Sequence, residues 1–82
     1  MKILPLHSDI VRYLKRHNLQ KKFEKQIRFL KNDIHHPSLA VELLEPKHLR
    51  IFSFRVDRQY RAIFIFHDRN AIEVIDVNNH YR

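Results

Sequence analysis

The sequence contains neither glycine nor cysteine among its 82 residues. Without glycine it cannot form the phosphate-binding loop of P-loop proteins or the dinucleotide-binding fingerprint, because both depend on a backbone that lacks Cβ atoms at several positions. Without cysteine it has no disulfide, thiol nucleophile or zinc–thiolate site, which fits the reducing cytosol. Any recognition of phosphate must come from side chains or helix ends.

Long hydrophobic runs are also missing. No segment approaches the roughly 18 apolar residues of a membrane span, and the start, Met1 to Leu6, is too short and too weakly apolar for a secretion signal. We therefore expect a soluble, cytoplasmic protein. A chain of this length is expected to form a single domain over residues 1–82 that buries only about 60% of its unfolded surface, so that an open groove is more plausible than a deep pocket.

Positive charge is abundant. Sixteen Lys and Arg residues against nine Asp and Glu residues give a formal net charge of +7. Each cation that meets a phosphate releases condensed counterions, so this charge favours polyanionic partners such as nucleic acid. An acidic protein would satisfy the same field, and the sequence alone does not separate the two partners.

Apolar residues at helical spacing predict two helices in the first half, over about Asp9–His17 and Leu19–Asn32, after a short strand within Lys2–Leu6. Ser8 is placed to cap the first helix. The outward face of the second helix is basic, which indicates either a solvated surface or a phosphate contact. Its cations are Lys21, Lys22, Lys25, Arg28 and Lys31.

The hydrophobic period changes after Pro37, which cannot continue a helix. Alternating residues predict three strands over Leu49–Val56, Tyr60–Phe66 and Ala71–Val77, joined by short turns. The strand over Tyr60–Phe66 is apolar on both faces after Arg61, which is typical of a central strand that is covered on both sides. We expect an α+β fold in the order β-α-α-β-β-β, with a two-helix hairpin packed on a small, mainly antiparallel twisted sheet.

Residues of the second half could cleave RNA without a metal ion. A base that removes the proton of a 2′-OH, a cation on the phosphate and an acid that protonates the leaving 5′-oxygen suffice, and the product carries a 2′,3′-cyclic phosphate. Glu42 is the candidate base, Arg61 the phosphate clamp and His80 the acid, while Tyr81 offers a ring for stacking. The other histidines lack metal-ligand spacing, so we expect no metal and no cofactor.

Each of these residues also has a structural interpretation. Glu42 could be a solvated residue of the connector expected over Ser38–Pro46, and Arg61 could form a surface ion pair with Asp57 or Asp76. His80 and Tyr81 could belong to a frayed chain end.

Residues 36–82 resemble the RelE/ParE toxin superfamily of bacterial and archaeal toxin–antitoxin systems, and most of all its YoeB-type and RelE-type messenger-RNA interferases. The segments that carry the resemblance are SFRVDRQYRAIF (residues 53–64) and the terminal HYR (residues 80–82). The resemblance implies a ribosome-dependent endoribonuclease that cuts messenger RNA and is held inactive by a cognate antitoxin, for which an acidic protein is expected.

The resemblance also implies roles for particular residues. Glu42 would be the general base, Arg61 the arginine that stabilises the scissile phosphate, His80 the general acid and Tyr81 the aromatic ring that orients a base. Glu45 stands where a related toxin has a lysine, and Lys47 or His48 could take the place of that cation. The residues expected to bind RNA are Arg55, Lys47 and Arg82.

Two other functions fit the same scaffold. One is a ParE-like inhibitor of DNA gyrase, which would need no acid–base pair. The other is a non-catalytic module or decayed toxin that binds only an antitoxin or nucleic acid through its basic surface.

Overall fold

A computed structural model describes residues 1–80 and gives an α+β fold of two helices and a sheet. The elements, in chain order, are β1 (Lys2–Ile3), α1 (Ser8–Arg16), α2 (Gln20–Asn32), the 3₁₀ turn η1 (Pro37–Leu39), β2 (Glu42–Leu43), the 3₁₀ turn η2 (Lys47–Leu49), β3 (Phe52–Arg55), β4 (Arg61–Asp68) and β5 (Ala71–Asn78).

The sheet has five strands in the order β1-β5-β4-β3-β2. All neighbouring strands are antiparallel except β1, which runs parallel to β5. The predicted architecture is therefore confirmed, and β4 is central as expected. The structure adds one strand: Glu42 and Leu43, predicted to lie in a connector, pair with Ser53 and Phe52 of β3. A strand of two residues has no periodicity by which sequence analysis could detect it.

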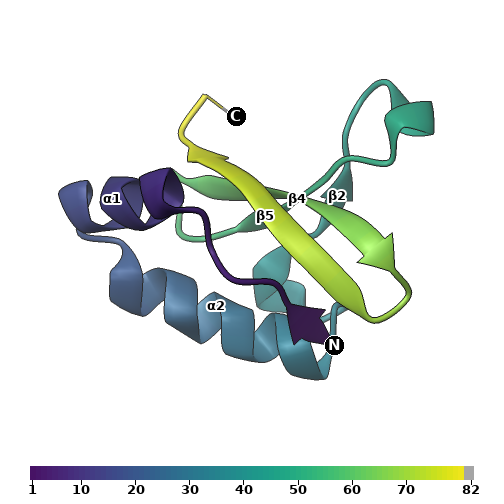
Figure 1. Cartoon of the computed structure of the whole chain (residues 1–82), viewed down its shortest axis with the longest axis horizontal. Helices are drawn as coiled ribbons and strands as arrows, with labels where there is room; N and C mark the ends of the chain where they lie inside the picture. Colours follow the sequence, from purple (N-terminus) through teal and green to yellow (C-terminus); the bar gives the residue numbers. More distant parts are fainter. Residues whose placement is uncertain (81–82) are drawn as a thin grey trace.

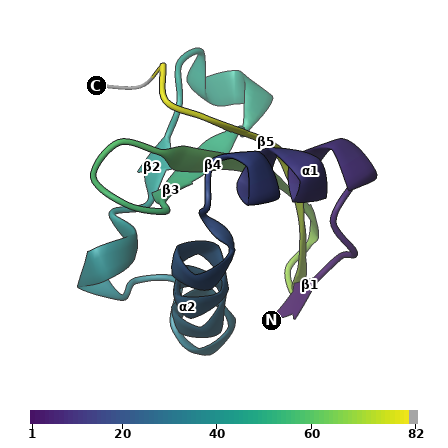
Figure 2. The same cartoon turned by 90° about the vertical axis from the view of Figure 1, so that its left-hand side faces the viewer.

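The two faces of the sheet are covered differently (Figures 1 and 2). Helix α2 lies along one face, and α1 lies beside β5. The η2 segment and the C-terminal end of the described chain lie on the other side of the sheet, which we call the open face. The connector and the chain end thus border the open face, whereas a helix covers the opposite face.

The hydrophobic core lies between the helices and the sheet. Phe54 of β3 and Phe64 of β4 are fully buried there, against Leu14 of α1 and Phe23 and Leu30 of α2. Full burial of such a side chain contributes about 1.5–3 kcal/mol. Because side chains alternate along a strand, the same pattern that buries Phe54 and Phe64 directs their neighbours towards the open face.

Gln26 is a buried polar residue that ties α2 to the rest of the fold. Its Nε2 donates to the carbonyl oxygens of Ser38 (3.1 Å) and Arg55 (2.8 Å), and its Oε1 accepts from the Ser38 hydroxyl (3.2 Å). Ser38 belongs to η1, and Arg55 is the last residue of β3. One side chain therefore fixes α2 to η1 and to the end of β3.

Several predicted boundaries are wrong by a few residues. Ser8 is the first residue of α1 and His7 occupies the N-cap position without a side-chain cap, so the expected Ser8 cap is absent. The strand predicted from Leu49 begins only at Phe52, because Lys47–Leu49 forms η2 and Arg50 is left-handed (φ 54°). The first strand ends at Ile3.

At the other end of the sheet the chain turns later than predicted. Strand β4 continues through His67 and Asp68, two residues beyond the predicted strand end at Phe66. The turn between β4 and β5 is therefore limited to Arg69 and Asn70.

Without glycine, the chain places other residues in left-handed conformations. Among the described residues these are Asn18 (φ 57°), Ala40 (φ 44°) and Arg50. Asparagine tolerates this region, whereas alanine and arginine carry a cost of about 1–2 kcal/mol. Ala40 lies immediately before the segment that leads into β2, and its conformation turns the connector there. Over the described residues, no helix is long and apolar enough to cross a lipid bilayer.

Candidate active site

Arg61, the first residue of β4, is buried on the open face with only 6% of its surface exposed. Its Nε donates to the Ser53 hydroxyl (3.0 Å), and its Nη2 donates to the carbonyl oxygens of Ala40 (2.5 Å) and Ser53 (3.4 Å). Ala40 has a left-handed conformation, and its carbonyl oxygen faces the guanidinium at this turn. The orientation of the Arg61 guanidinium is therefore fixed by its neighbours.

The electrostatic environment of Arg61 combines burial with two charged neighbours. Burial is the main cause that lowers the pKa of Arg61, and the positive charge of Arg55 lowers it further, whereas the carboxylate of Glu42 acts in the opposite direction. Arginine nevertheless stays charged at neutral pH, because its ordinary pKa is so high. Two guanidinium groups and one carboxylate thus act on one another at this end of the sheet.

The strand register explains why these groups meet. Arg55 is paired with Arg61, Arg61 with Asn78, and Glu42 with Ser53. Residues directly opposite in an antiparallel pair share a face, as do residues two apart in one strand. Glu42, Ser53, Arg55 and Arg61 therefore all belong to the open face, and Glu42 and Arg55 are exposed there.

His80 lies just beyond the C-terminal end of β5. It lies two residues beyond Asn78, the partner of Arg61 in the sheet, and its backbone N–H donates to the Asn78 side-chain oxygen (3.2 Å). Its side chain is exposed. Tyr81 and Arg82, predicted as a stacking ring and an RNA contact, lie outside the described residues.

Lys47 lies on a different part of the open face. It is exposed on η2, and Figure 1 places that segment apart from the C-terminal end of β5. The structure therefore groups Glu42, Arg55 and Arg61 with the end of β5, and it places Lys47 at a distance from that group.

Ser53 and Ala40 are the residues of this site that sequence analysis missed. Ser53 is fully buried, and its side chain and backbone both accept from Arg61. A signal for Ser53 exists, because a small polar residue interrupts the apolar run over residues 51–54. The contact with Ala40 depends on a backbone carbonyl, which no side-chain pattern reveals.

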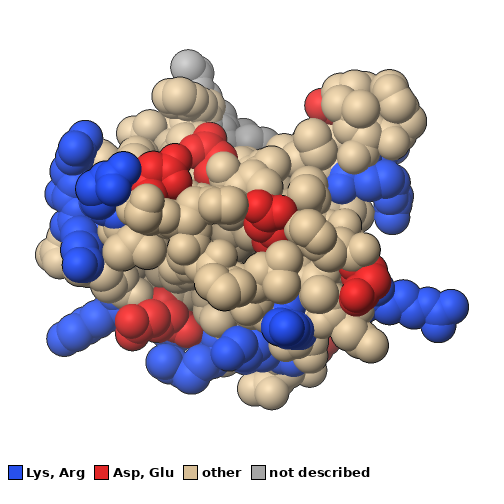
Figure 3. Space-filling model, viewed as in Figure 1, with Lys and Arg blue, Asp and Glu red and all other residues tan. Residues whose placement is uncertain are grey.

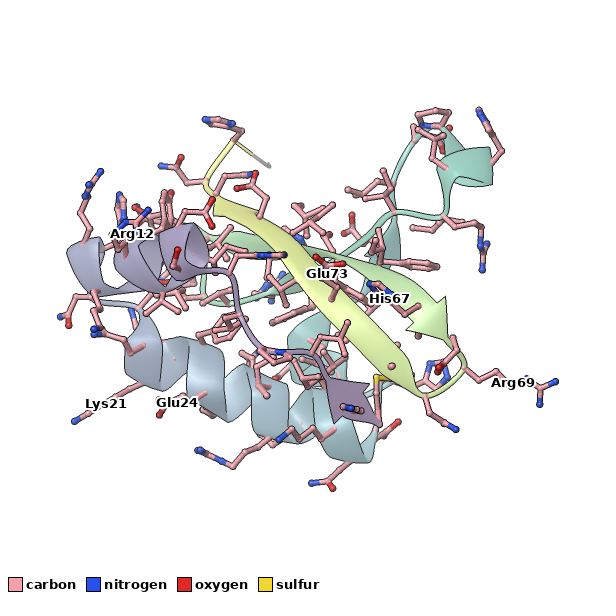
Figure 4. All side chains as sticks on the ribbon, viewed as in Figure 1. Arg12, Lys21, Glu24, His67, Arg69 and Glu73 are labelled. Atoms are coloured by element: carbon pink, nitrogen blue, oxygen red, sulfur yellow. The ribbon has the colours of Figure 1, made fainter. Side chains whose placement is uncertain are left out.

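A second polar cluster lies nearer the other end of β5 (Figure 4). Glu73 accepts from His67 at Oε1 (2.6 Å) and interacts with His7 through Oε2 (2.5 Å). The hydrogen bond with His67, followed by that with His7, lowers the pKa of Glu73 below its ordinary value. No group of three or more potential ligands suited to a metal ion occurs among residues 1–80. This cluster joins the start of α1 to β4 and β5.

Comparison with known proteins gives structural relatives. No protein-family model matches the chain, and no curated protein matches its sequence. A solved YoeB/ParE toxin from Agrobacterium tumefaciens superposes with a TM-score of 0.69 at 21% identity, over 99% of this chain and 100% of that chain. A YoeB–YefM complex from Staphylococcus aureus gives a TM-score of 0.71 at 17% identity, over 99% and 98% of the two chains.

A YoeB dimer from Staphylococcus aureus is also similar, with a TM-score of 0.66 at 17% identity over 98% of this chain and 94% of that chain. These matches span nearly the full length on both sides. The chain therefore has the fold of the YoeB/ParE toxins.

Proposed function

We propose that this protein is the toxin of a type II toxin–antitoxin system and that it cleaves messenger RNA on the ribosome by metal-independent acid–base catalysis. Two lines support the proposal: the YoeB-like fold, and the resemblance of residues 36–82 to messenger-RNA interferases. The single observation that carries the chemistry is the pairing of Arg55 with Arg61 on the open face, beside Glu42 and at the end of β5 that leads to His80.

The paired arginines provide a place for a phosphate. The positive charge of Arg55 contributes to the lowered pKa of Arg61, so the two guanidinium groups repel one another, and a bound anion relieves that repulsion. Arg61 is held in place by Ser53 and Ala40, so it supplies a fixed positive charge that needs little reorganisation during the reaction. Arg55 is exposed and can contact the phosphate directly. In this proposal Arg55 binds the phosphate and Arg61 stabilises the charge that develops on it.

The proton transfers follow from the groups that flank this pair. The Glu42 carboxylate removes the proton of the 2′-OH, the 2′-oxygen forms a bond to the adjacent phosphorus, and the bond from phosphorus to the 5′-oxygen breaks. His80, in its protonated form, gives its proton to the leaving 5′-oxygen. The products are a 2′,3′-cyclic phosphate and a 5′-hydroxyl end. Groups of this kind typically contribute about 10²–10⁴-fold each to the rate.

Residues outside this group have supporting roles in the proposal. Tyr81 would stack on a base, and Arg82 and Lys47 would contact RNA phosphates. Because the open face of so small a domain offers little enclosure, the ribosome would hold the message in the reactive geometry. The partner that restrains activity would be an acidic antitoxin, in keeping with the net charge of +7 and with the YoeB–YefM complex among the structural relatives.

The proposal is tested by mapping the ends of messenger RNA after expression of the protein, in cells and on purified translating ribosomes. We expect new ends within coding regions for the wild type, and none for Glu42→Gln or His80→Gln. Both changes are at exposed positions and should leave the fold intact. Arg69→Gln, at the exposed turn between β4 and β5, is a control for the loss of charge and should cleave normally.

Two other outcomes would contradict the proposal. Growth arrest with intact messages and impaired DNA supercoiling would indicate a gyrase inhibitor. Binding to an acidic antitoxin without arrest or cleavage would indicate a non-catalytic module.

A further inference from the structure

A basic groove of about 770 Å³ lies between α2 and the turn that joins β3 to β4. We propose that this groove binds the sugar–phosphate backbone of the single-stranded RNA beyond the reacting phosphate. This inference rests on the proposed function and extends it, because it assigns a path to the part of the substrate that leaves the reaction site. The residues that line the groove are Lys22, Lys25, Gln26, Ser38, Arg55, Val56, Asp57, Arg58 and Gln59.

The charge of the groove is positive, with four basic side chains and one carboxylate, that of Asp57. Asp57 is already engaged: Lys22 Nζ lies 3.1 Å from its Oδ2, and the backbone N–H groups of Gln59 and Tyr60 donate to its Oδ1. Burial alone would raise the pKa of Asp57, but these hydrogen bonds and the charge of Lys22 outweigh it and lower that pKa. The carboxylate is therefore neutralised locally, and three cations remain to attract an anion.

Lys25 and Arg58 are the two cations best placed for this role. Both are exposed, and neither side chain forms a hydrogen bond or ion pair in the part of the chain that the structure describes. They approach the groove from different elements, Lys25 from α2 and Arg58 from the turn. Two cations on opposite sides of one hollow can hold a single chain of phosphates between them.

The basic face of α2 is divided between two hollows. Lys22 and Lys25 line the basic groove, whereas Arg28 and Lys31 line a separate hollow of about 490 Å³ between α1 and α2. The second hollow is more apolar, with Leu6, Val11 and Ile27 in its lining. In Figure 3 positive side chains are spread along the lower edge of the molecule, over α2, and others gather at its left end, over α1. Of the predicted basic face of α2, only Lys22 and Lys25 therefore line the proposed RNA path.

The groove is continuous with the proposed reaction site. Arg55 lines the groove and is also paired with Arg61 in the sheet, so an RNA strand held at Arg61 reaches the groove by passing Arg55. None of the described lining residues is aromatic, which fits contact with phosphates and not stacking on bases. A specific protein partner would need apolar anchors, and Val56 is the sole aliphatic residue in this lining. The lining thus favours RNA over an acidic protein segment.

The test compares two double variants with the same loss of charge. Lys25→Gln/Arg58→Gln removes two groove cations, and Lys21→Gln/Arg69→Gln removes two exposed cations that do not line the groove. Figure 4 shows Lys21 and Arg69 projecting from opposite ends of the molecule. The probe is a fluorescent single-stranded RNA with 2′-O-methyl groups throughout, which lacks the attacking hydroxyl and cannot be cleaved. Its affinity for the full chain is measured by anisotropy as a function of salt concentration.

For the groove variant we expect the slope of log K against log salt to become shallower by about 1.4, since each phosphate contact to a single strand contributes about 0.7. At 0.1 M salt this corresponds to about 25-fold weaker binding. The control variant should change the slope by less than half as much. Circular dichroism must show that both variants are folded.

Several results would overturn the inference: no binding of the probe by the wild type, equal losses in the two variants, or a groove variant that loses affinity for an oligo-glutamate peptide but not for RNA. The last result would assign the groove to an acidic protein. Because the probe cannot be cut, this measurement is independent of catalysis. Absence of cleavage with the expected slope change would refute the proposed nuclease alone, and cleavage with an unchanged slope would refute the groove alone.

Discussion

Replacing Ser53 with alanine removes the hydroxyl that accepts from Arg61 Nε at 3.0 Å. Ser53 is fully buried and Arg61 nearly so, so water has little access to the donor that is left behind. A hydrogen bond to a charged group contributes about 1.5–3 kcal/mol net, and the loss of the acceptor is felt in full because the buried donor cannot turn to water instead. We expect Ser53→Ala to lower the free energy of unfolding by about 1.5–3 kcal/mol. For a domain of this size, this corresponds to a decrease in Tm of about 6–24 °C.

Ser38→Ala is the matched control. The Ser38 hydroxyl also makes one hydrogen bond, to Oε1 of Gln26 at 3.2 Å, but its partner is neutral and Ser38 is only half-buried. The expected loss is about 0.5–1.5 kcal/mol. Thermal unfolding followed by circular dichroism compares the two variants, and a single-turnover cleavage assay below both melting temperatures reports on the position of the guanidinium.

The reasoning requires Ser53→Ala to be the more damaging change in both assays. Equal melting temperatures for the two variants would show that the Ser53 hydroxyl does not support the Arg61 charge. Wild-type cleavage by Ser53→Ala would show that the orientation of Arg61 is fixed without it.

Two further predictions concern the rest of the fold. Hydrogen bonds from His67 and then His7 lower the pKa of Glu73 from its ordinary 4.5, so its carboxylate adds stability above that pH which is lost as the pH falls through the lower folded value. The difference in Tm between wild type and Glu73→Gln should therefore be larger at pH 7 than at pH 3, and a difference that grows on acidification would contradict the assignment. Gln26→Ala leaves the carbonyls of Ser38 and Arg55 without their donor and should cost about 1–3 kcal/mol in urea unfolding; an unchanged midpoint would refute the bridging role of Gln26.

Much of the fold could be predicted from the sequence because its helices and long strands have strong periodicity. The Phe23 and Leu30 positions of α2, and the alternation that buries Phe54 and Phe64, follow from that pattern. The predictions failed at positions where the residue types give little signal of the backbone conformation. Without glycine, the left-handed turn at Arg50 had no sequence signal, so the strand was extended too far towards the N-terminus.

The candidate site could be predicted only in part. The sequence identified Arg61 and Glu42 as chemically suited residues, but their relation depends on β2, a strand too short to recognise. The sequence identified Arg61 as a phosphate clamp, and the structure adds that Arg61 is buried while its sheet partner Arg55 is exposed. The contribution of Ala40 comes from a backbone carbonyl and is invisible to any residue pattern.

The most direct test of the central claim is to identify the chemical ends of messenger RNA after incubation with purified ribosomes and the wild-type protein. If Glu42, Arg61 and His80 act on a 2′-hydroxyl as proposed, the upstream fragment ends in a 2′,3′-cyclic phosphate, and a single 2′-deoxy substitution at the cleaved nucleotide abolishes the cut. Cleavage that persists at the deoxy position, or that leaves a 3′-hydroxyl, would contradict the account.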